Sequence, residues 1–326
     1  MNPPATLSSM PSPAWELFRE EGIRTGTASW TDRSLLEPGL FYPPGVSRPE
    51  QRLAFYAEHF PIVEVDATYY ALPSEKNSES WARRTPDDFV FNVKAFSLMT
   101  QHPTNARGLP KDLRETLSRD VVDKPRIYPR DLPPDLIEET WTRFFAALRP
   151  LHEHHKLGAV LFQFPEWFPP SRQSRAYVAS CGDRLAAALP GVACAIEFRN
   201  ARWMSDEQRR ARTLALLREH GLAYVCVDMP QGFPTSIPPV AEATAPLALV
   251  RFHGRRSDTW GERNVGTHDK FGYEYSQREL AAWEPKIEHL ADEAREVHVL
   301  MNNCYRDYAV RSATMMAQIG LGLLEV

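Results

Sequence analysis

Cysteine is scarce in this chain of 326 residues, and no two cysteines stand at the close spacing of a metal-binding pair. This usage argues against the disulfide framework of small secreted domains and favours reduced thiols in the cytoplasm. Two of the four, Cys194 and Cys226, fall inside apolar stretches, where cysteine behaves as a small hydrophobic residue. Cys304 follows another apolar stretch, and we expect it to be inert because no activating neighbour is evident.

Long apolar runs and a strong excess of one charge are missing as well. No run approaches the roughly 18 residues that a membrane span requires. The formal net charge is −4 and the pI is about 6.2, so any interaction with nucleic acid would have to be local. Residues 1–22 are rich in Pro and Ser and lack the basic and apolar segments of an export signal. We interpret them as a lead-in and expect a cytoplasmic protein with no membrane partner.

What the chain does contain is a series of eight apolar stretches, each of which ends in polar or charged residues. Segments with helical character separate most of them. This alternation predicts an α/β fold, the (β/α)₈ TIM barrel, whose sites form at the C-terminal ends of the strands. The predicted strands are residues 23–30, 62–70, 89–96, 158–165, 193–200, 223–228, 247–254 and 296–303.

The barrel is expected to be one domain over residues 23–326, with long loops after strands 3, 6 and 7. The longest connection, residues 97–136, is rich in Pro, Arg, Lys and Asp and is typical of a lid-like insertion. Only a short helix, or none, is expected after strand 6. Pro285 should interrupt the helix over 277–294. Apolar spacing predicts the other helices at 49–60, 74–84, 137–154, 171–189, 206–221 and 305–320.

Side chains alternate between the two faces of a strand, so one set at each strand end should face the lumen of the barrel. Taking the apolar set as outward leaves a group of polar side chains pointing inward. Glu64 lies one pleat deeper, and we interpret it as a structural partner of Arg199 or Arg251. The inward group consists of Asp66, Thr68, Tyr70, Asn92, Lys94, Gln163, Glu197, Arg199, Asp228, Arg251, His253 and either Asn302 or Asn303.

Lys94, Arg199 and Arg251 are three cations expected at one end of the barrel. They suit an anionic ligand, because arginine can form two parallel hydrogen bonds with an anion and lysine supplies a movable point charge. A carboxylate beside two arginines should have a lowered pKa and act as a base, and a histidine that titrates near neutrality can return the proton. The catalytic candidates are Glu197, His253, Asp228 and Lys94. The substrate-binding candidates are Arg199, Arg251, Asn92, Gln163, Asp66, Thr68, Tyr70, Asn302, Asn303, Trp30, His102 and Arg255.

Several strand-end strings also resemble one known family. They include GTASW (26–30), EVDATYYALPS (64–74), FVFNVKAF (89–96), LGAVLFQFP (157–165), AIEFRNARW (195–203), LVRFHGR (249–255) and NNCYRDYAVRSA (302–313). In this order they are similar to the YecE-like family of domains of unknown function, DUF72. The resemblance implies a TIM barrel and supplies no established activity.

The first hypothesis is therefore an enzyme that performs acid/base chemistry, as an isomerase, lyase or hydrolase, on a phosphorylated or carboxylated small molecule. No resident cofactor is predicted. A metal-dependent variant, as in endonuclease IV-like phosphodiesterase barrels, would use an oxygen-rich site with one imidazole. Its ligands would come from Glu64, Asp66, Glu197, Asp228 and His253.

The second hypothesis is a module that binds nucleic acid. The loop after strand 7 interleaves basic and aromatic residues, which is what single-strand binding needs. The same residues could instead form a lid over a small-molecule pocket, and the salt dependence of binding would separate the two interpretations. These residues are Arg255, Arg256, Trp260, Arg263, His268, Lys270, Phe271, Tyr273 and Tyr275.

Overall fold

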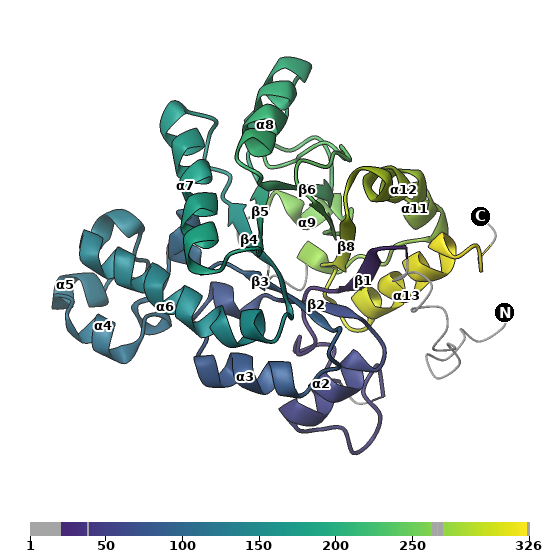
Figure 1. The fold of residues 1–326 in the computed structure, drawn as a ribbon, viewed down its shortest axis with the longest axis horizontal. Helices are drawn as coiled ribbons and strands as arrows, with labels where there is room; N and C mark the ends of the chain where they lie inside the picture. The colour runs from purple at the N-terminus through teal and green to yellow at the C-terminus, as the bar shows by residue number, and fades with distance from the viewer. Residues whose placement is uncertain (1–20, 38, 263–265, 267–269, 325–326) are drawn as a thin grey trace.

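Eight parallel strands close into a barrel in the computed structural model, which describes residues 21–37, 39–262, 266 and 270–324 (Figure 1). Each strand pairs with its neighbours in the sequence, and the last strand pairs with the first. The predicted (β/α)₈ fold is confirmed. The strands are β1 (Ile23–Thr27), β2 (Ile62–Val65), β3 (Val90–Lys94), β4 (Leu157–Phe164), β5 (Ala193–Phe198), β6 (Ala223–Asp228), β7 (Leu247–Phe252) and β8 (Glu296–Met301).

Helices surround the barrel and cover its outer face (Figure 1). Local signals fix several of their ends: Ser74 caps α3 by accepting from the backbone N–H of Asn77, and Gly221 follows α8 with a φ of 62°. The helices of the outer layer are α2 (Pro49–Ala57), α3 (Glu75–Arg83), α6 (Pro134–Glu153), α7 (Arg172–Ala188), α8 (Glu207–Glu219), α11 (Gln277–Ala281), α12 (Glu284–Glu293) and α13 (Tyr308–Gly320).

The connections follow the expected pattern with three refinements. Between β6 and β7 the described residues 229–246 contain no helix. The helix expected over 277–294 is divided into α11 and α12, and Pro285 lies in the first turn of α12. The insertion 97–136 contains two short α-helices, α4 (Lys111–Glu115) and α5 (Arg119–Val122).

Most of the expected lead-in and two residues of the expected basic loop, Arg263 and His268, lie outside the described residues. α9 (Ser257–Trp260) is the part of that loop next to β7. Three 3₁₀ helices close to strand ends matter for the site: η2 (Ala67–Tyr69), η3 (Ser97–Thr100) and η6 (Ala201–Trp203).

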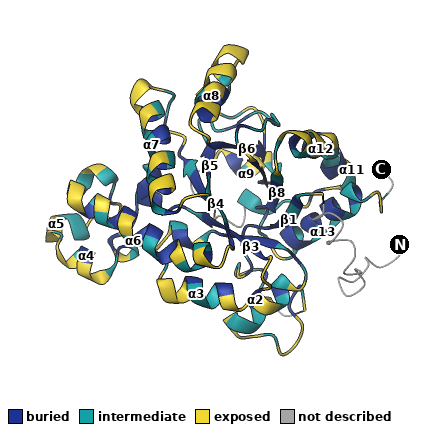
Figure 2. Cartoon of the chain, viewed as in Figure 1, coloured by how far each residue is buried: buried dark blue, intermediate teal, exposed yellow. Residues whose placement is uncertain are grey.

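The hydrophobic core lies between the barrel and its helices, where the strands are buried and the helices are buried on one side (Figure 2). On α6, Trp141 stacks on Phe162 of β4 with ring centroids 5.8 Å apart. Because Phe162 faces α6, its neighbour Gln163 must face the lumen. The pairing registers extend this assignment around the barrel: Gln163 is level with Glu197 on β5, and Arg251 is level with Leu300 on β8.

Candidate active site

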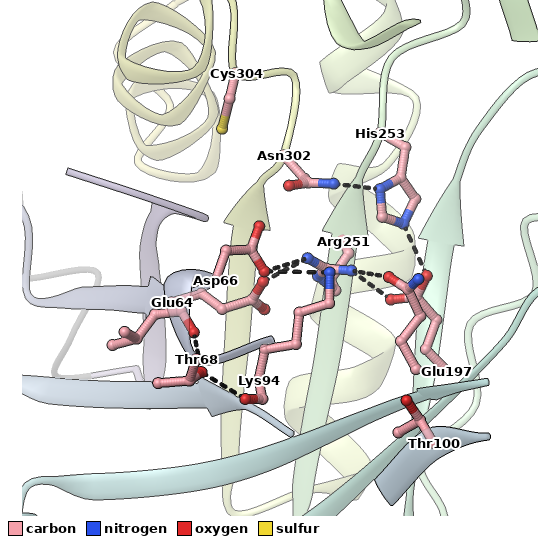
Figure 3. A network of polar contacts seen from close by, with 12 residues as sticks. Glu64, Asp66, Thr68, Lys94, Thr100, Glu197, Arg251, His253, Asn302 and Cys304 are labelled. Atoms are coloured by element: carbon pink, nitrogen blue, oxygen red, sulfur yellow. Dashed lines mark hydrogen bonds and ion pairs between the residues drawn. The ribbon is translucent and has the colours of Figure 1, made fainter. Parts of the chain in front are cut away.

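Arg251 lies at the centre of the charged network in the lumen, and its side chain is fully buried (Figure 3). Its guanidinium forms ion pairs with Glu64 and, at 2.6 Å, with Glu197. Gln163 Oε1 accepts from Arg251 Nη1 at 3.3 Å. Burial opposes the charge of Arg251, but the two carboxylates outweigh this effect and raise its pKa. Arg251 therefore cross-links the strands as a permanent cation, and Glu64 is its partner as the sequence suggests.

Glu197 is enclosed by positive and polar partners. One carboxylate oxygen contacts Arg251, and the other lies 2.5 Å from Arg199 Nε and 3.2 Å from His253 Nε2. Burial alone would raise the pKa of Glu197, but Arg199 and Arg251 hold it well below its usual range. The expected lowering of this pKa is present. A carboxylate with such a low pKa and both oxygens engaged is a poor proton acceptor, so the geometry does not favour Glu197 as the general base.

His253 is buried and neutral, contrary to the expectation that it titrates near neutral pH. Burial and the positive charge of Arg199 lower the pKa of His253 to about 3. Its Nδ1 lies 2.8 Å from the side-chain amide nitrogen of Asn302, and its Nε2 lies 3.2 Å from Glu197 and 3.1 Å from Arg199 Nη2. The imidazole orients Glu197 and cannot return a proton as an imidazolium at neutral pH.

Lys94 and Arg199 are the two cations of the network that reach solvent. Their side chains are 13% and 12% exposed, whereas that of Arg251 is 0% exposed. Lys94 Nζ lies 3.3 Å from Asp66 and 5.0 Å above the ring of Tyr69. The guanidinium of Arg199 lies 5.6 Å from the ring of Trp260 in α9. These two side chains, together with Asp66, mark the open rim of the barrel.

Glu64 and Asp66 form a carboxyl pair with opposite pKa shifts. Burial raises the pKa of Glu64 to about 8, even though Arg251 opposes the rise. Lys94 and Arg251 lower the pKa of Asp66 despite the opposing effect of burial. A carboxyl with a raised pKa beside one with a lowered pKa is the arrangement of a carboxylic acid next to a carboxylate. These opposite directions favour one proton shared by the pair, with Glu64 as its holder.

The ionised groups of the network do not cancel. Three cations, Lys94, Arg199 and Arg251, face two ionised carboxylates, Asp66 and Glu197. The pKa shifts described above leave Glu64 and His253 neutral at pH 7. With Glu64 protonated, one positive charge is in surplus, and Lys94 and Arg199 are the cations positioned to present it to a ligand.

His102 comes from the insertion and lies at the same rim, as expected. Thr100 donates its only hydroxyl proton to the carbonyl of Ser97 at 3.1 Å. Thr100 Oγ1 also lies 2.9 Å from His102 Nδ1, so this hydroxyl orients the imidazole. Burial and the charges of Lys94 and Arg199 lower the pKa of His102 to about 3, so the imidazole is uncharged at neutral pH.

The structure places Asp228 outside the lumen, which corrects its assignment as a catalytic candidate. Asp228 is level with Phe252 on the outer face of β7. Its carboxylate accepts from Arg255 at 2.7 and 2.9 Å, from Tyr275 at 2.7 Å and from Trp283 Nε1 at 2.7 Å. Residues 223–228 are apolar on both faces apart from this aspartate, so alternation could not assign the faces. Arg255 is its ion-pair partner and lies outside the lumen too.

The structure shows which of the two asparagines after β8 points into the lumen. Asn302 faces the lumen and bonds His253, whereas Asn303 donates to the carbonyl of Tyr273 at 2.8 Å on the outer side. Asn303 is thus structural. Asn92 faces the lumen, but its amide oxygen bonds His298 at 3.1 Å, away from the rim. Its assignment as a substrate-binding residue is not supported by this position.

The candidates at the ends of strands 1 and 2, namely Trp30, Thr68 and Tyr70, do not join the charged network in the lumen. β2 ends at Val65, and the 3₁₀ helix η2 replaces the alternation beyond it. Thr68 is buried and donates to the carbonyl of Val65 at 2.9 Å. Tyr70 is 65% exposed, so it does not point into the lumen. Trp30 is buried and its ring packs edge-on against Trp81 of α3 at 5.8 Å.

Two aromatic residues of the rim are not singled out by the sequence. Tyr69 lies under Lys94, and Trp167 follows β4 with its ring centroid 5.6 Å from that of His102. Each is an aromatic residue a few positions beyond a strand end, and that position is the signal that could have identified them. The predicted residues that do meet at the rim or just below it are Asp66, Lys94, His102, Gln163, Glu197, Arg199, Arg251, His253 and Asn302.

The aromatic side chains described after β7 are buried or half-buried, and Phe271 and Tyr273 are the half-buried ones. Trp260 and Tyr275 are buried, and the Tyr273 hydroxyl donates to Glu279 at 2.6 Å. Arg256 pairs with Asp258 at 3.0 Å. These rings pack on the rim instead of forming an exposed stacking surface.

Neither a metal site nor a membrane span is evident in the described part of the chain. Within residues 21–37, 39–262, 266 and 270–324, no three side chains of His, Cys, Asp or Glu are grouped so that they could hold a metal ion. Glu64 and Glu197 face Arg251 instead of one another. None of the helices in the same ranges is long and apolar enough to cross a membrane.

A closed parallel barrel with its charged residues gathered at the C-terminal ends of the strands defines a TIM-barrel protein with a candidate active site. Comparison with known proteins then identifies the family. The chain belongs to the family described as "Protein of unknown function DUF72", whose model matches residues 24–321. The resemblance noted in the sequence is thereby confirmed.

Relatives match over nearly the whole chain. The UPF0759 protein YunF of Bacillus subtilis (strain 168) is 33% identical over 285 residues, which cover 86% of this chain and 88% of that protein. A DUF72 family protein from Enterococcus faecalis V583 has a TM-score of 0.72 at 25% identity, covering 93% of this chain and 96% of its own. A DUF72 family protein from Thermotoga maritima MSB8 has a TM-score of 0.68 at 28% identity, covering 93% and 99%.

Proposed function

We propose that this protein is an enzyme that binds a small phosphorylated or carboxylated molecule at the barrel rim and performs acid/base chemistry on it. The observation that carries the proposal is the pair of cations, Lys94 and Arg199, that reach solvent beside Asp66 at the end of the barrel. Both would bind the anionic group, Lys94 as a point charge and Arg199 as a fork.

The carboxyl pair is the proton carrier in this proposal. A pKa of about 8 for Glu64 is close to neutrality, which suits a general acid. Asp66, whose side chain is 28% exposed, is the member that contacts the ligand. The proton passes from Glu64 to Asp66 and from Asp66 to a basic atom of the ligand. Both carboxylates are then ionised, and Lys94 and Arg251 stabilise the new charge.

Sulfate binding tests the anion site directly. At low ionic strength, calorimetry should show that wild type binds sulfate and that Lys94→Met and Arg199→Met each weaken binding by about tenfold or more. Lys111→Met is the matched control, because the Lys111 side chain is 80% exposed on α4 and its ion pair with Glu115, at 3.7 Å, lies at the surface. Equal sulfate affinity in all four proteins would contradict the proposal.

Turnover tests the carboxyl pair once a ligand is identified from metabolites that stabilise the protein against heat. Asp66→Asn should retain the ligand yet lose turnover by about a hundredfold or more, because the amide cannot pass a proton. Asp206→Asn is the control, since Asp206 caps α8 at the surface. Full turnover in Asp66→Asn would remove the pair from the mechanism.

Nucleic-acid binding is the alternative for the same rim. The inward packing of Trp260 and Tyr275 gives it less support than a small ligand. Affinity for an oligonucleotide that falls steeply with rising salt would favour this alternative. A small-ligand site that is partly enclosed should respond to salt much less.

We propose no resident metal for the reaction. The two most buried carboxylates, Glu64 and Glu197, are bound to Arg251, and a divalent ion would have to compete with that cation. Activity should therefore survive treatment with a chelator, and loss of activity that only added metal restores would show that a metal takes part.

A further inference from the structure

A cavity of about 750 Å³ opens beside the rim, between the insertion 97–136 and the segment that joins β4 to α7. Its volume lies within the roughly 300–1,000 Å³ usual for small-molecule pockets. Its lining includes the aromatic rings of Tyr128, Trp167 and Tyr177 and the side-chain amides of Gln101 and Gln173. The insertion therefore contributes a wall to a binding-sized space.

Trp167 is the most unusual residue of this wall. Trp167 is 52% exposed, although most large apolar residues of the described chain are buried. Its indole N–H donates to the carbonyl of Gln101 at 3.4 Å. Gln101 has a φ of 64°, a left-handed conformation that is uncommon for a residue other than glycine. The indole is thus held by the backbone of a left-handed residue while about half of Trp167 stays exposed beside the cavity.

A row of rings connects the cavity to the anion site. The Trp167 ring centroid is 5.6 Å from that of His102, and the His102 centroid is 5.3 Å from that of Tyr69. Lys94 Nζ lies 5.0 Å from the centroid of Tyr69. Trp167 is thus linked to Lys94 through two ring contacts and one cation–π contact, and the cavity wall lies beside the anion site.

We propose that the cavity binds the planar heterocycle of a nucleoside phosphate, stacked on Trp167, while Lys94 and Arg199 hold the phosphate. This inference rests on the proposed function and names its substrate class. Bases stack on exposed aromatic rings whatever their sequence, and the amides of Gln101 and Gln173 can pair with donors and acceptors at a base edge. The described residues that line the cavity include no carboxylate and do include Arg130, so a phosphate is not repelled.

Calorimetry with separate parts of the ligand tests the proposal. The titrants are the four common ribonucleoside 5′-monophosphates, ribose 5-phosphate, sulfate and the free nucleosides. At least one nucleoside monophosphate should bind wild type about tenfold or more tightly than ribose 5-phosphate does. Trp167→Ala should abolish that difference and leave the affinity for ribose 5-phosphate unchanged, and Trp167→Phe should keep most of the difference.

Tyr70→Ala is the matched control, because it removes an aromatic ring that is 65% exposed but does not line the cavity. It should keep the full preference for the nucleoside monophosphate. Equal affinities for every nucleoside monophosphate and ribose 5-phosphate in wild type, or a preference that survives in Trp167→Ala, would overturn the inference.

The outcomes also separate this inference from the proposed function. Sulfate and ribose 5-phosphate that bind in a Lys94-dependent manner, without any gain from a base, would leave the anion site standing and overturn the heterocycle site. Nucleosides that bind through Trp167, with no contribution from a phosphate, would support the cavity assignment and contradict the anion site.

Discussion

At the scale of single residues, the charge of the rim depends on how three carboxyl groups, Glu64, Asp66 and Glu197, share the cation of Arg251. Arg251 neutralises Glu197 and contacts Glu64, but it cannot keep both Glu64 and Asp66 ionised so close together. Glu64 is the more deeply buried of the two and keeps the proton. The consequence is a rim that carries more positive than negative charge.

Removing Arg251 should be costly. Arg251→Met leaves Glu64 and Glu197 buried without their shared cation, and we expect a loss of about 3–5 kcal/mol in the free energy of unfolding. Urea denaturation would measure it. Arg209→Met is the control, because its pair with Asp206 is at the surface, and it should cost about 0.5 kcal/mol or less. A loss below about 1 kcal/mol for Arg251→Met would show that the network is not built on this residue.

The proton on Glu64 should appear in the pH dependence of stability. The pKa of Glu64 rises from 4.5 to about 8 on folding, so the native state binds more protons than the unfolded chain between these values. The stability contributed by Glu64 is therefore fully present below about pH 4.5 and is lost as the pH rises through 8. Denaturation at a series of pH values should show wild type losing stability relative to Glu64→Gln over this window. Parallel curves would mean that Glu64 is ionised in both states.

At the scale of elements, alternation predicts a strand well when one of its faces is polar and fails when both are apolar. β5 and β7 present Glu197 and Arg251 opposite Phe198 and Phe252, and their inward faces follow directly from the sequence. β6 is apolar on both faces except at Asp228, so its inward face could not be assigned. β2 is shorter than its apolar pattern because η2 begins at Ala67, and no local signal marks that change.

The outward position of Asp228 yields a prediction of its own. Asp228→Asn weakens the bonds from Arg255, Tyr275 and Trp283, which tie β6 to the outer layer. We expect a loss of about 2 kcal/mol in the free energy of unfolding, with unchanged sulfate affinity. Unfolding and sulfate calorimetry on the same preparation would measure both. Unchanged stability together with a tenfold loss of sulfate affinity would return Asp228 to the site.

At the scale of the whole molecule, barrel closure is what brings the site together. Glu64 and Arg251 are separated by 187 positions in the sequence, yet they share an ion pair because β2 and β7 face each other across the lumen. The register of eight strands thus converts distant strand ends into one network. The sequence could predict the charged residues of β5 and β7 that converge, but which of them share a proton or an ion pair depends on distances that only the folded barrel defines.

Ligand binding at this network should stabilise the entire fold. Sulfate at about a hundred times its dissociation constant should raise the free energy of unfolding by about 2.7 kcal/mol. Sulfate also stabilises proteins by exclusion from their surface, so the comparison is with Lys94→Met at the same concentration. Equal stabilisation of both proteins would show that sulfate acts without the rim site.

The most direct test of the account is the sulfate affinity of wild type and Glu64→Gln between about pH 6 and pH 9, a range in which sulfate keeps its charge. Glutamine can still accept from Arg251 and donate to Asp66 but cannot ionise. Wild-type affinity should fall as the pH passes the value of about 8 at which Glu64 ionises, whereas the affinity of Glu64→Gln should stay constant. The same pH dependence in both proteins would contradict the claim that a neutral Glu64 gives the rim its positive charge.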